Sequence, residues 1–131
     1  MTVAVVDAAT IVDLICDLPA ADGFRHHLAE ADAVAVPAHL DAEVLSVLGR
    51  LKRAGQLTHE AERVTALGTL SARRWPLQPL LTAAWELTDR IAVRDALYVA
   101  LAASLDATLI TSDARLRRGA SDIVNVAEPE E

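Results

Sequence analysis

The sequence has few of the residue types that build disulfide-bonded or membrane-spanning proteins. It contains 1 cysteine in 131 residues, which excludes an internal disulfide and a cysteine-based zinc site. Aromatic residues make up 3% of the chain, so the core must consist mainly of Ala, Val, Leu and Ile. The N-terminal apolar run is interrupted by Asp7 and Asp13, so neither a signal peptide nor a transmembrane helix of roughly 20 residues fits. We expect a cytoplasmic protein with no membrane association.

The chain also lacks an excess of positive charge. Its formal net charge is −7, which argues against binding nucleic acid by bulk electrostatics alone. It does not exclude a nuclease that binds its substrate through metal ions. The length of 131 residues fits one domain, with residues 127–131 expected to form a loose tail.

Short aliphatic strands alternate with helices along the sequence. Strands are predicted at Thr2–Val6, Ala33–Val36, Thr108–Thr111 and Ile123–Val126. Helices are predicted after the first strand to Ile15, at Asp22–Ala31, at His39–Ala54, from a Thr58 cap to Leu70, at Leu80–Thr88, at Arg94–Leu105 and from Asp113 to a stop at Gly119, with an extended connector at Trp75–Pro79. This alternation predicts an α/β fold, a short parallel sheet with helices on both faces.

Acidic residues follow the predicted strands and begin the helices after them. Asp7 follows the first strand, and Asp113 lies beyond the end of the Thr108–Thr111 strand. Glu43 and Asp95 lie in the first turns of two helices. Because ligands bind beyond the carboxyl ends of parallel strands, the four acids could converge there. Considered singly, each aspartate could simply cap a helix, and Glu43 could be solvated or paired with Arg50.

Four carboxylates that converge without cations would repel one another and raise one another's pKa values, so such a cluster implies a bound metal ion. Oxygen ligands favour hard ions, here Mg²⁺ or Mn²⁺. One or two such ions polarise a phosphoryl oxygen and lower the pKa of an attacking water. This is the chemistry of phosphodiester hydrolysis.

The segments that carry the acids read VVDA at 5–8, AEV at 42–44, RDALYVALA at 94–102 and LITSDARL at 109–116. In order, spacing and extent they resemble the PIN-domain ribonucleases, more narrowly the VapC-type toxins of toxin–antitoxin pairs. The resemblance spans nearly the whole chain and implies a PIN-like three-layer α/β/α fold.

The resemblance also implies a function. Asp7, Glu43, Asp95 and Asp113 would be catalytic and would hold one or two Mg²⁺ or Mn²⁺ ions, with a metal-activated water attacking an RNA phosphate. A VapB-like antitoxin would block the site. Two positions depart from the pattern. Ala9 stands where many relatives carry Ser or Thr, so Thr10 or Thr111 would have to supply the hydroxyl, and Arg94 stands where many carry an aromatic residue or His.

Eleven of the 12 basic residues are arginines, since Lys52 is the single lysine. Substrate contacts are predicted for the residues around Asp113 that could reach an RNA backbone: Thr111, Arg115, Arg117 and Arg118. A solvated basic turn is the open alternative. Aliphatic stripes between Asp22 and Leu70 predict a homodimer and a groove for an antitoxin helix. Trp85 is expected in the core or a dimer contact.

Single residues argue against two other classes of protein with an α/β fold. A haloacid-dehalogenase-like enzyme needs a second Asp at position 9, which is Ala9. A response-regulator receiver needs a lysine after a late strand, whereas Lys52 lies within a predicted helix. The remaining alternative is a catalytically silent PIN-like module for binding or assembly, which loss of an acid would signal. All four acids are present.

Overall fold

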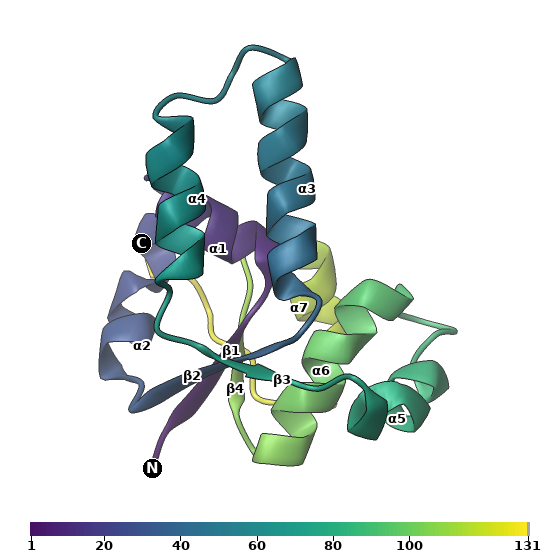
Figure 1. Ribbon diagram of the computed structural model, residues 1–131. Helices are drawn as coiled ribbons and strands as arrows, with labels where there is room; N and C mark the ends of the chain where they lie inside the picture. The colour runs from purple at the N-terminus through teal and green to yellow at the C-terminus, as the bar shows by residue number, and fades with distance from the viewer. Residues whose placement is uncertain (131) are drawn as a thin grey trace.

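A four-stranded parallel sheet forms the centre of the computed structural model, which describes residues 1–130 (Figure 1). Its strands are β1 (Val3–Val6), β2 (Ala33–Pro37), β3 (Arg73–Trp75) and β4 (Thr108–Ile110). They lie in the order β3-β2-β1-β4, and each neighbouring pair is parallel. Val5 of the central strand pairs with Ala35 on one side and Leu109 on the other. The carboxyl ends of all four strands therefore point the same way.

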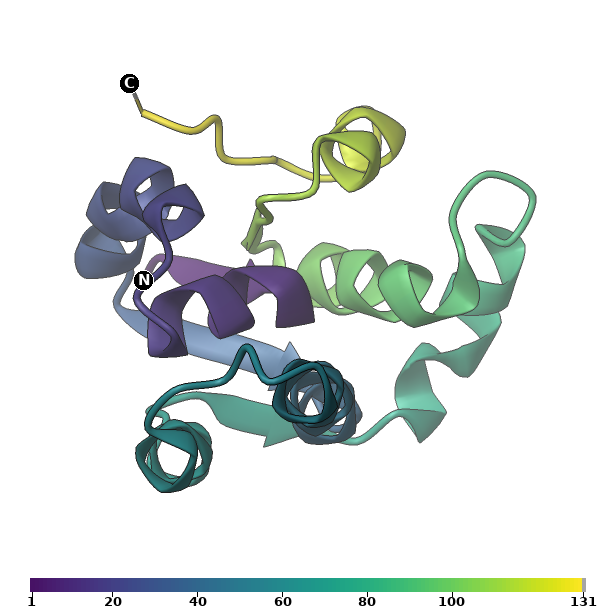
Figure 2. The same cartoon turned by 90° about the horizontal axis from the view of Figure 1, so that it is seen from above.

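Helices cover both faces of this sheet. They are α1 (Ala8–Ile15), α2 (Arg25–Glu30), α3 (Leu40–Arg53), α4 (Glu60–Gly68), α5 (Leu81–Glu86), α6 (Val93–Leu105) and α7 (Ala114–Ala120), with 3-10 turns η1 (Pro19–Phe24) and η2 (Gln78–Leu80). Helix α6 contacts β1, β2 and β4, whereas α1 packs against α3 and α4 on the other side (Figures 1 and 2). The predicted α/β fold with helices on both faces is confirmed.

The core is aliphatic, as the shortage of aromatic residues predicted. Helix α6 is buried continuously from Ala96 to Ala102, because it lies between the sheet and α5. Phe24 and Tyr98 are the aromatic side chains among the largest fully buried ones. Within residues 1–130 no helix combines the length and hydropathy that a membrane crossing requires.

At the edges of the sheet one strand was missed by the sequence analysis and one strand prediction was wrong. The segment predicted as an extended connector contributes its first residue, Trp75, to strand β3, which pairs with β2. Three residues, two of them arginines, carry too little apolar pattern to be read as a strand. At the other edge, Ile123–Val126 forms no strand, because Val126 makes one isolated bridge to Leu109.

Three helix boundaries also differ from prediction. The segment Asp22–Ala31 is divided into η1 and α2, because Pro19 starts a 3-10 turn that takes in its first residues. Thr58 does not cap α4, which begins after His59 in a left-handed conformation with φ 53°. Gly119 lies inside α7 rather than ending it.

The C-terminal segment runs back along the outside of β4 towards α2. Ala127 N donates to Leu109 O at 2.9 Å, and Glu130 N donates to Gly23 O at 2.7 Å. His27 Nε2 lies 2.8 Å from Glu128 O. The described part of the predicted loose tail is therefore bonded at three points, and Glu131 lies outside the described residues.

The guanidinium of Arg74 joins three elements. It donates to both carboxylate oxygens of Asp41 in the first turn of α3, at 3.2 and 2.9 Å. It also donates to the carbonyls of Leu67, Leu70 and Ala72, at 3.0, 2.9 and 3.0 Å. Because these carbonyls lie at or beyond the end of α4, Arg74 satisfies acceptors that the helix itself cannot. It therefore fixes the edge strand β3 to α3 and α4.

Replacing Arg74 with methionine should lower the free energy of unfolding by about 2 kcal/mol, because hydrogen bonds between charged groups are lost. Urea denaturation measures this. The control is Arg53→Met, since Arg53 is exposed at the end of α3. Its effect should stay within about 0.5 kcal/mol. Equal losses in the two variants would contradict a structural role for Arg74.

Candidate active site

A cavity of about 700 Å³ opens at the carboxyl edge of the sheet, and all four predicted acids line it. They are Asp7, Glu43, Asp95 and Asp113. The first follows β1, the last follows β4, and the other two lie in the first turns of α3 and α6. Parallel strand order therefore brings together residues that are up to about a hundred positions apart in the sequence.

Asp7 is buried at the end of the central strand and caps α1. One of its oxygens accepts from the backbone N–H of Thr10 at 3.1 Å and from the Thr10 hydroxyl at 2.5 Å. The other accepts from the Thr111 hydroxyl at 2.5 Å. Burial raises the pKa of the Asp7 carboxyl, although these hydrogen bonds act in the opposite direction. Thr10 and Thr111 thus supply the hydroxyls that Ala9 cannot.

Glu43 is nearly buried, with a side-chain exposure of 17%. Its Oε1 accepts from the Tyr98 hydroxyl at 2.8 Å and lies 3.2 Å from His39 Nε2. Its Oε2 lies 3.9 Å from Nε of Arg94, whose side chain is 78% exposed. Oε1 of Glu43 therefore has two close polar neighbours, whereas Oε2 has one at a longer distance.

Asp95 and Asp113 form the more open part of the acid cluster. Burial raises the pKa of Asp95, and the nearby charges of Asp113 and Glu43 raise it further. Asp113 Oδ1 accepts from the backbone N–H groups of Arg115 and Leu116, at 2.9 and 3.3 Å, which caps α7. The open alternative of simple helix capping is thus realised at Asp7 and Asp113, in side chains that also face the cavity.

The acid cluster has the chemistry of a divalent metal site. Its carboxylates disfavour one another's ionisation, and Arg94 is the nearest cation to Glu43. Oxygen donors of this kind suit Mg²⁺ or Mn²⁺. As the side chains stand in residues 1–130, no three acidic, histidine or cysteine residues form a ready-made ion cage. The residues fit such an ion by donor type, and an ion would have to draw their carboxylates closer together.

A second cavity, of about 190 Å³, adjoins the first. Its lining includes Asp95 and Asp113, which the two cavities share, together with Arg90 and Arg115. Arg90 is engaged elsewhere, since its Nη2 donates to Asp122 at 2.5 Å. Asp95 and Asp113 therefore line both cavities.

The predicted substrate contacts occupy different environments. Thr111 is fully buried against Asp7 and does not reach the surface. Arg117 Nη1 donates to the Thr111 carbonyl at 3.0 Å and so braces the same strand end. Arg115 is exposed and lines the smaller cavity. Arg118 is exposed but lines neither cavity beside the acids.

His39 and Tyr98 contact the acid cluster but were not among the predicted site residues. A spacing signal was available, because His39 precedes Glu43 by four positions and Tyr98 follows Asp95 by three. On a helix these spacings place side chains on one face. Thr10 carries the same kind of signal, three positions after Asp7.

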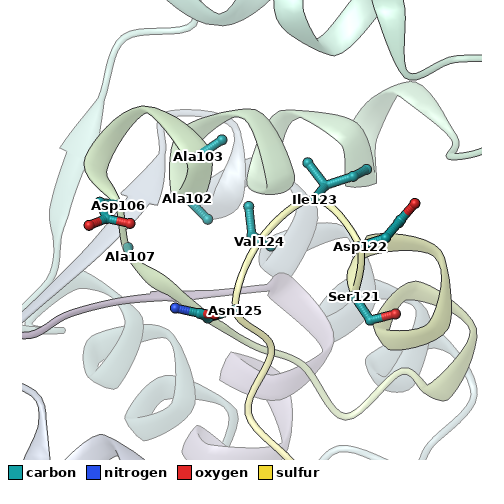
Figure 3. Close-up of a pocket in the computed structure, with 9 residues that line it drawn as sticks. All are labelled: Ala102, Ala103, Asp106, Ala107, Ser121, Asp122, Ile123, Val124 and Asn125. Carbon is teal, nitrogen blue, oxygen red and sulfur yellow. The ribbon is translucent and has the colours of Figure 1, made fainter.

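Another cavity, of about 310 Å³, lies away from the acids, between the end of α6 and the turn after α7 (Figure 3). Its polar side chains are Asp106, Ser121, Asp122 and Asn125. None of the predicted site residues lines it, so it is separate from the candidate active site.

Comparisons with known proteins identify a family and a fold for this chain. The PIN domain family matches residues 4–121. The chain is 42% identical over 117 residues to Ribonuclease VapC3 of Mycobacterium tuberculosis, covering 87% of this chain and 85% of that protein. The fold is similar to VapBC2 from Rickettsia felis bound to a promoter DNA fragment (TM-score 0.71, 16% identity, 98% and 100% coverage). It is also similar to a toxin–antitoxin complex from Klebsiella pneumoniae (TM-score 0.67, 19% identity, 98% of each chain).

Replacing Asp7 with asparagine should stabilise the fold at neutral pH in EDTA. Burial raises the pKa of Asp7 above its unfolded value, so the folded chain is more stable when this carboxyl is protonated. That stability is fully present below the unfolded pKa of about 3.9 and is lost as pH rises through the folded pKa. Asparagine does not ionise, so the Asp7→Asn variant keeps this stability as the pH rises. Each kcal/mol of stability gained raises Tm by about 4 °C.

Thermal denaturation between pH 3.5 and 8 measures the effect. The gain in Tm of Asp7→Asn over the unmodified protein should grow with pH. The control is Asp106→Asn, since Asp106 is exposed in a left-handed conformation that asparagine also adopts. A gain that is independent of pH, or equal in the control, would contradict a destabilising buried charge at Asp7.

Proposed function

The chain belongs to the PIN-domain family and, within it, to the VapC ribonucleases, and we propose that it is a metal-dependent endoribonuclease toxin. The observation that carries this proposal is the convergence of four carboxylates on one cavity. Such a cluster is costly without cations and suits phosphodiester hydrolysis with them. The 42% identity to a ribonuclease supports RNA as the substrate, and an RNA substrate favours action in the cytoplasm.

Asp7, Glu43, Asp95 and Asp113 would hold one or two Mg²⁺ or Mn²⁺ ions. When bound, such an ion would polarise a phosphoryl oxygen and make a water more acidic. The chain itself orients the carboxylates. Thr10 and Thr111 fix Asp7 from two directions, and the N–H groups at the start of α7 fix Asp113.

The two cavities suggest how an RNA strand would lie. A scissile phosphate beside Asp95 and Asp113, which line both cavities, would have one flanking nucleotide in each cavity. Arg50 and Arg94 line the larger cavity, and Arg115 lines the smaller one. We assign these three arginines to the flanking phosphates, which guanidinium groups bind in pairs of hydrogen bonds. Thr111 and Arg117 would act indirectly, since they support the end of β4.

A VapB-like antitoxin is the proposed protein partner. An apolar groove of about 470 Å³ lies between α3 and α4. Leu45 and Val64 line it and are about half exposed, at 48% and 47%. A groove of this kind accepts the apolar face of an amphipathic helix. The similarity in fold to proteins solved as toxin–antitoxin complexes supports this partner.

We also propose a homodimer, through α5. Leu81 and Trp85 lie one turn apart on this helix and are 54% and 72% exposed. Exposed aromatic residues of this size are typical of protein interfaces. Trp85 is therefore assigned to a dimer contact rather than to the core.

The purified protein should cut total cellular RNA into discrete fragments with Mg²⁺ or Mn²⁺ and not with EDTA. Asp95→Asn should reduce the cleavage rate by at least about 100-fold, because a metal ligand contributes no less than the groups that orient it. Asp106→Asn changes an exposed aspartate that lines neither of the two cavities beside the acids, and this variant should cleave at the unmodified rate. Metal-independent cleavage, or full activity of Asp95→Asn, would refute the four-acid site. No cleavage under any condition would favour the non-catalytic binding module.

Arg115→Gln should weaken binding of a single-stranded RNA about tenfold, because a charged hydrogen bond to phosphate is lost. The slope of log affinity against log salt should fall by about 0.7, the value for one phosphate contact. Fluorescence anisotropy in EDTA measures both quantities without cleavage. Arg53→Gln is the control, since Arg53 is exposed at the far end of α3. An equal effect of both variants would indicate only a loss of general positive charge.

A further inference from the structure

The strongest feature that the proposed mechanism does not use is a pair of donors behind Glu43. Tyr98 and His39 both approach the same oxygen, Oε1, at 2.8 and 3.2 Å. Their rings also pack together, with centroids 5.0 Å apart and planes inclined by 47°. Oε1 of Glu43 thus lies beside two donor side chains, whereas Oε2 lies on the side of Arg94.

The surroundings of His39 identify which ring nitrogen carries a proton. Nε2 lies 3.2 Å from Glu43 Oε1 and 3.1 Å from the carbonyl oxygen of Arg94. Both are acceptors, so Nε2 must be the donor. Nδ1 is buried and has no hydrogen-bond partner in residues 1–130. The imidazole of His39 therefore makes its polar contacts through Nε2–H alone.

His39 connects α3 and α6, the two helices that carry Glu43 and Asp95. His39 is the residue before α3, and Arg94 immediately precedes Asp95 in the first turn of α6. The Nε2–H group hydrogen-bonds to the Arg94 carbonyl, with Glu43 Oε1 3.2 Å from the same nitrogen, so His39 holds the start of α3 against the start of α6. The distance between Glu43 and Asp95 therefore depends on this histidine.

Tyr98 makes the second connection between the same helices. It lies on α6, one turn after Asp95, and is almost fully buried. Its hydroxyl donates to Glu43 Oε1 at 2.8 Å. Glu43 is held to α6 both through this hydroxyl and through His39.

We propose that His39 and Tyr98 are positioning residues that fix Glu43 Oε1 and leave Oε2 to bind a divalent ion at a set distance from Asp95. This inference rests on the proposed metal site. Oε2 lies 3.9 Å from Arg94 Nε, beyond hydrogen-bond distance, and Glu43 lines the cavity that the acids share. Groups that orient metal ligands in this way typically contribute 10- to 100-fold to metal affinity.

The test is Mn²⁺ binding by the purified full-length protein without RNA, measured as the loss of the free Mn²⁺ signal in electron paramagnetic resonance. Tyr98→Phe removes only the hydroxyl and should weaken Mn²⁺ binding about tenfold or more. His39→Leu should weaken it similarly. His39→Gln keeps an N–H donor and should recover part of the loss. Cleavage by all three variants should approach the unmodified rate at saturating Mn²⁺.

Ser46→Ala is the control, since Ser46 lines the same cavity but its hydroxyl donates to Ala42 O at 2.9 Å. It should bind Mn²⁺ as the unmodified protein does. Circular dichroism checks folding, and Tyr98→Phe decides the outcome if His39→Leu does not fold. Unchanged binding in Tyr98→Phe, with binding lost in Glu43→Gln, would overturn this inference alone. An unmodified protein that binds no Mn²⁺ would overturn the metal site and this inference together.

Discussion

The hydrogen bonds around the buried carboxylate of Asp7 determine how the rest of the site is arranged. They connect the end of β1, the first turn of α1 and the end of β4 in one cluster. Thr10 and Thr111, the two hydroxyl donors, are fully buried, so water cannot replace them. Asp7 N also donates to Ile110 O at 3.2 Å, which continues the sheet ladder up to the acid. The charge is therefore held at the point where two parallel strands end.

Each acid of the cluster lies at the start of a helix. Asp7 and Asp113 are the N-caps of α1 and α7, and Glu43 and Asp95 lie in the first turns of α3 and α6. Unpaired backbone N–H groups at helix starts favour negative charge, so they offset part of the repulsion among the carboxylates. Capping and metal binding are thus compatible explanations of the same residues. The local role keeps each acid in place, and the cluster gives them a common chemistry.

Five of the arginine side chains show two different kinds of contact. Arg74 and Arg63 bind carbonyls at the ends of helices, and Arg117 binds the carbonyl of Thr111. These guanidinium groups hold segments together. Arg50 and Arg115 instead line the cavities beside the acids. A chain of net charge −7 thus concentrates cationic groups where an RNA backbone would lie.

Much of this protein could be predicted from local sequence patterns. Continuous aliphatic runs locate β1, β2 and β4, an amphipathic run of period 3.6 locates α3, and a run that is apolar almost all round locates α6, because burial of apolar side chains dominates their stability. The acids could be found because each follows a strand or starts a helix. The edge strand β3 could not, because its three residues are stabilised by pairing with β2 and by Arg74 contacts to distant carbonyls.

The sequence by itself determined the α/β class, the aliphatic core and the four candidate acids, since these depend on composition, periodicity and short spacings. Tertiary structure decided which donors from distant parts of the chain reach each acid. Thr111 reaches Asp7 across 104 positions, and Tyr98 reaches Glu43 across 55. The tertiary structure also decided which arginines bind carbonyls at helix ends and which line the cavities beside the acids. Such contacts arise from the order of strands in the sheet, which brings the start of α3 beside the start of α6, and no local pattern encodes this order.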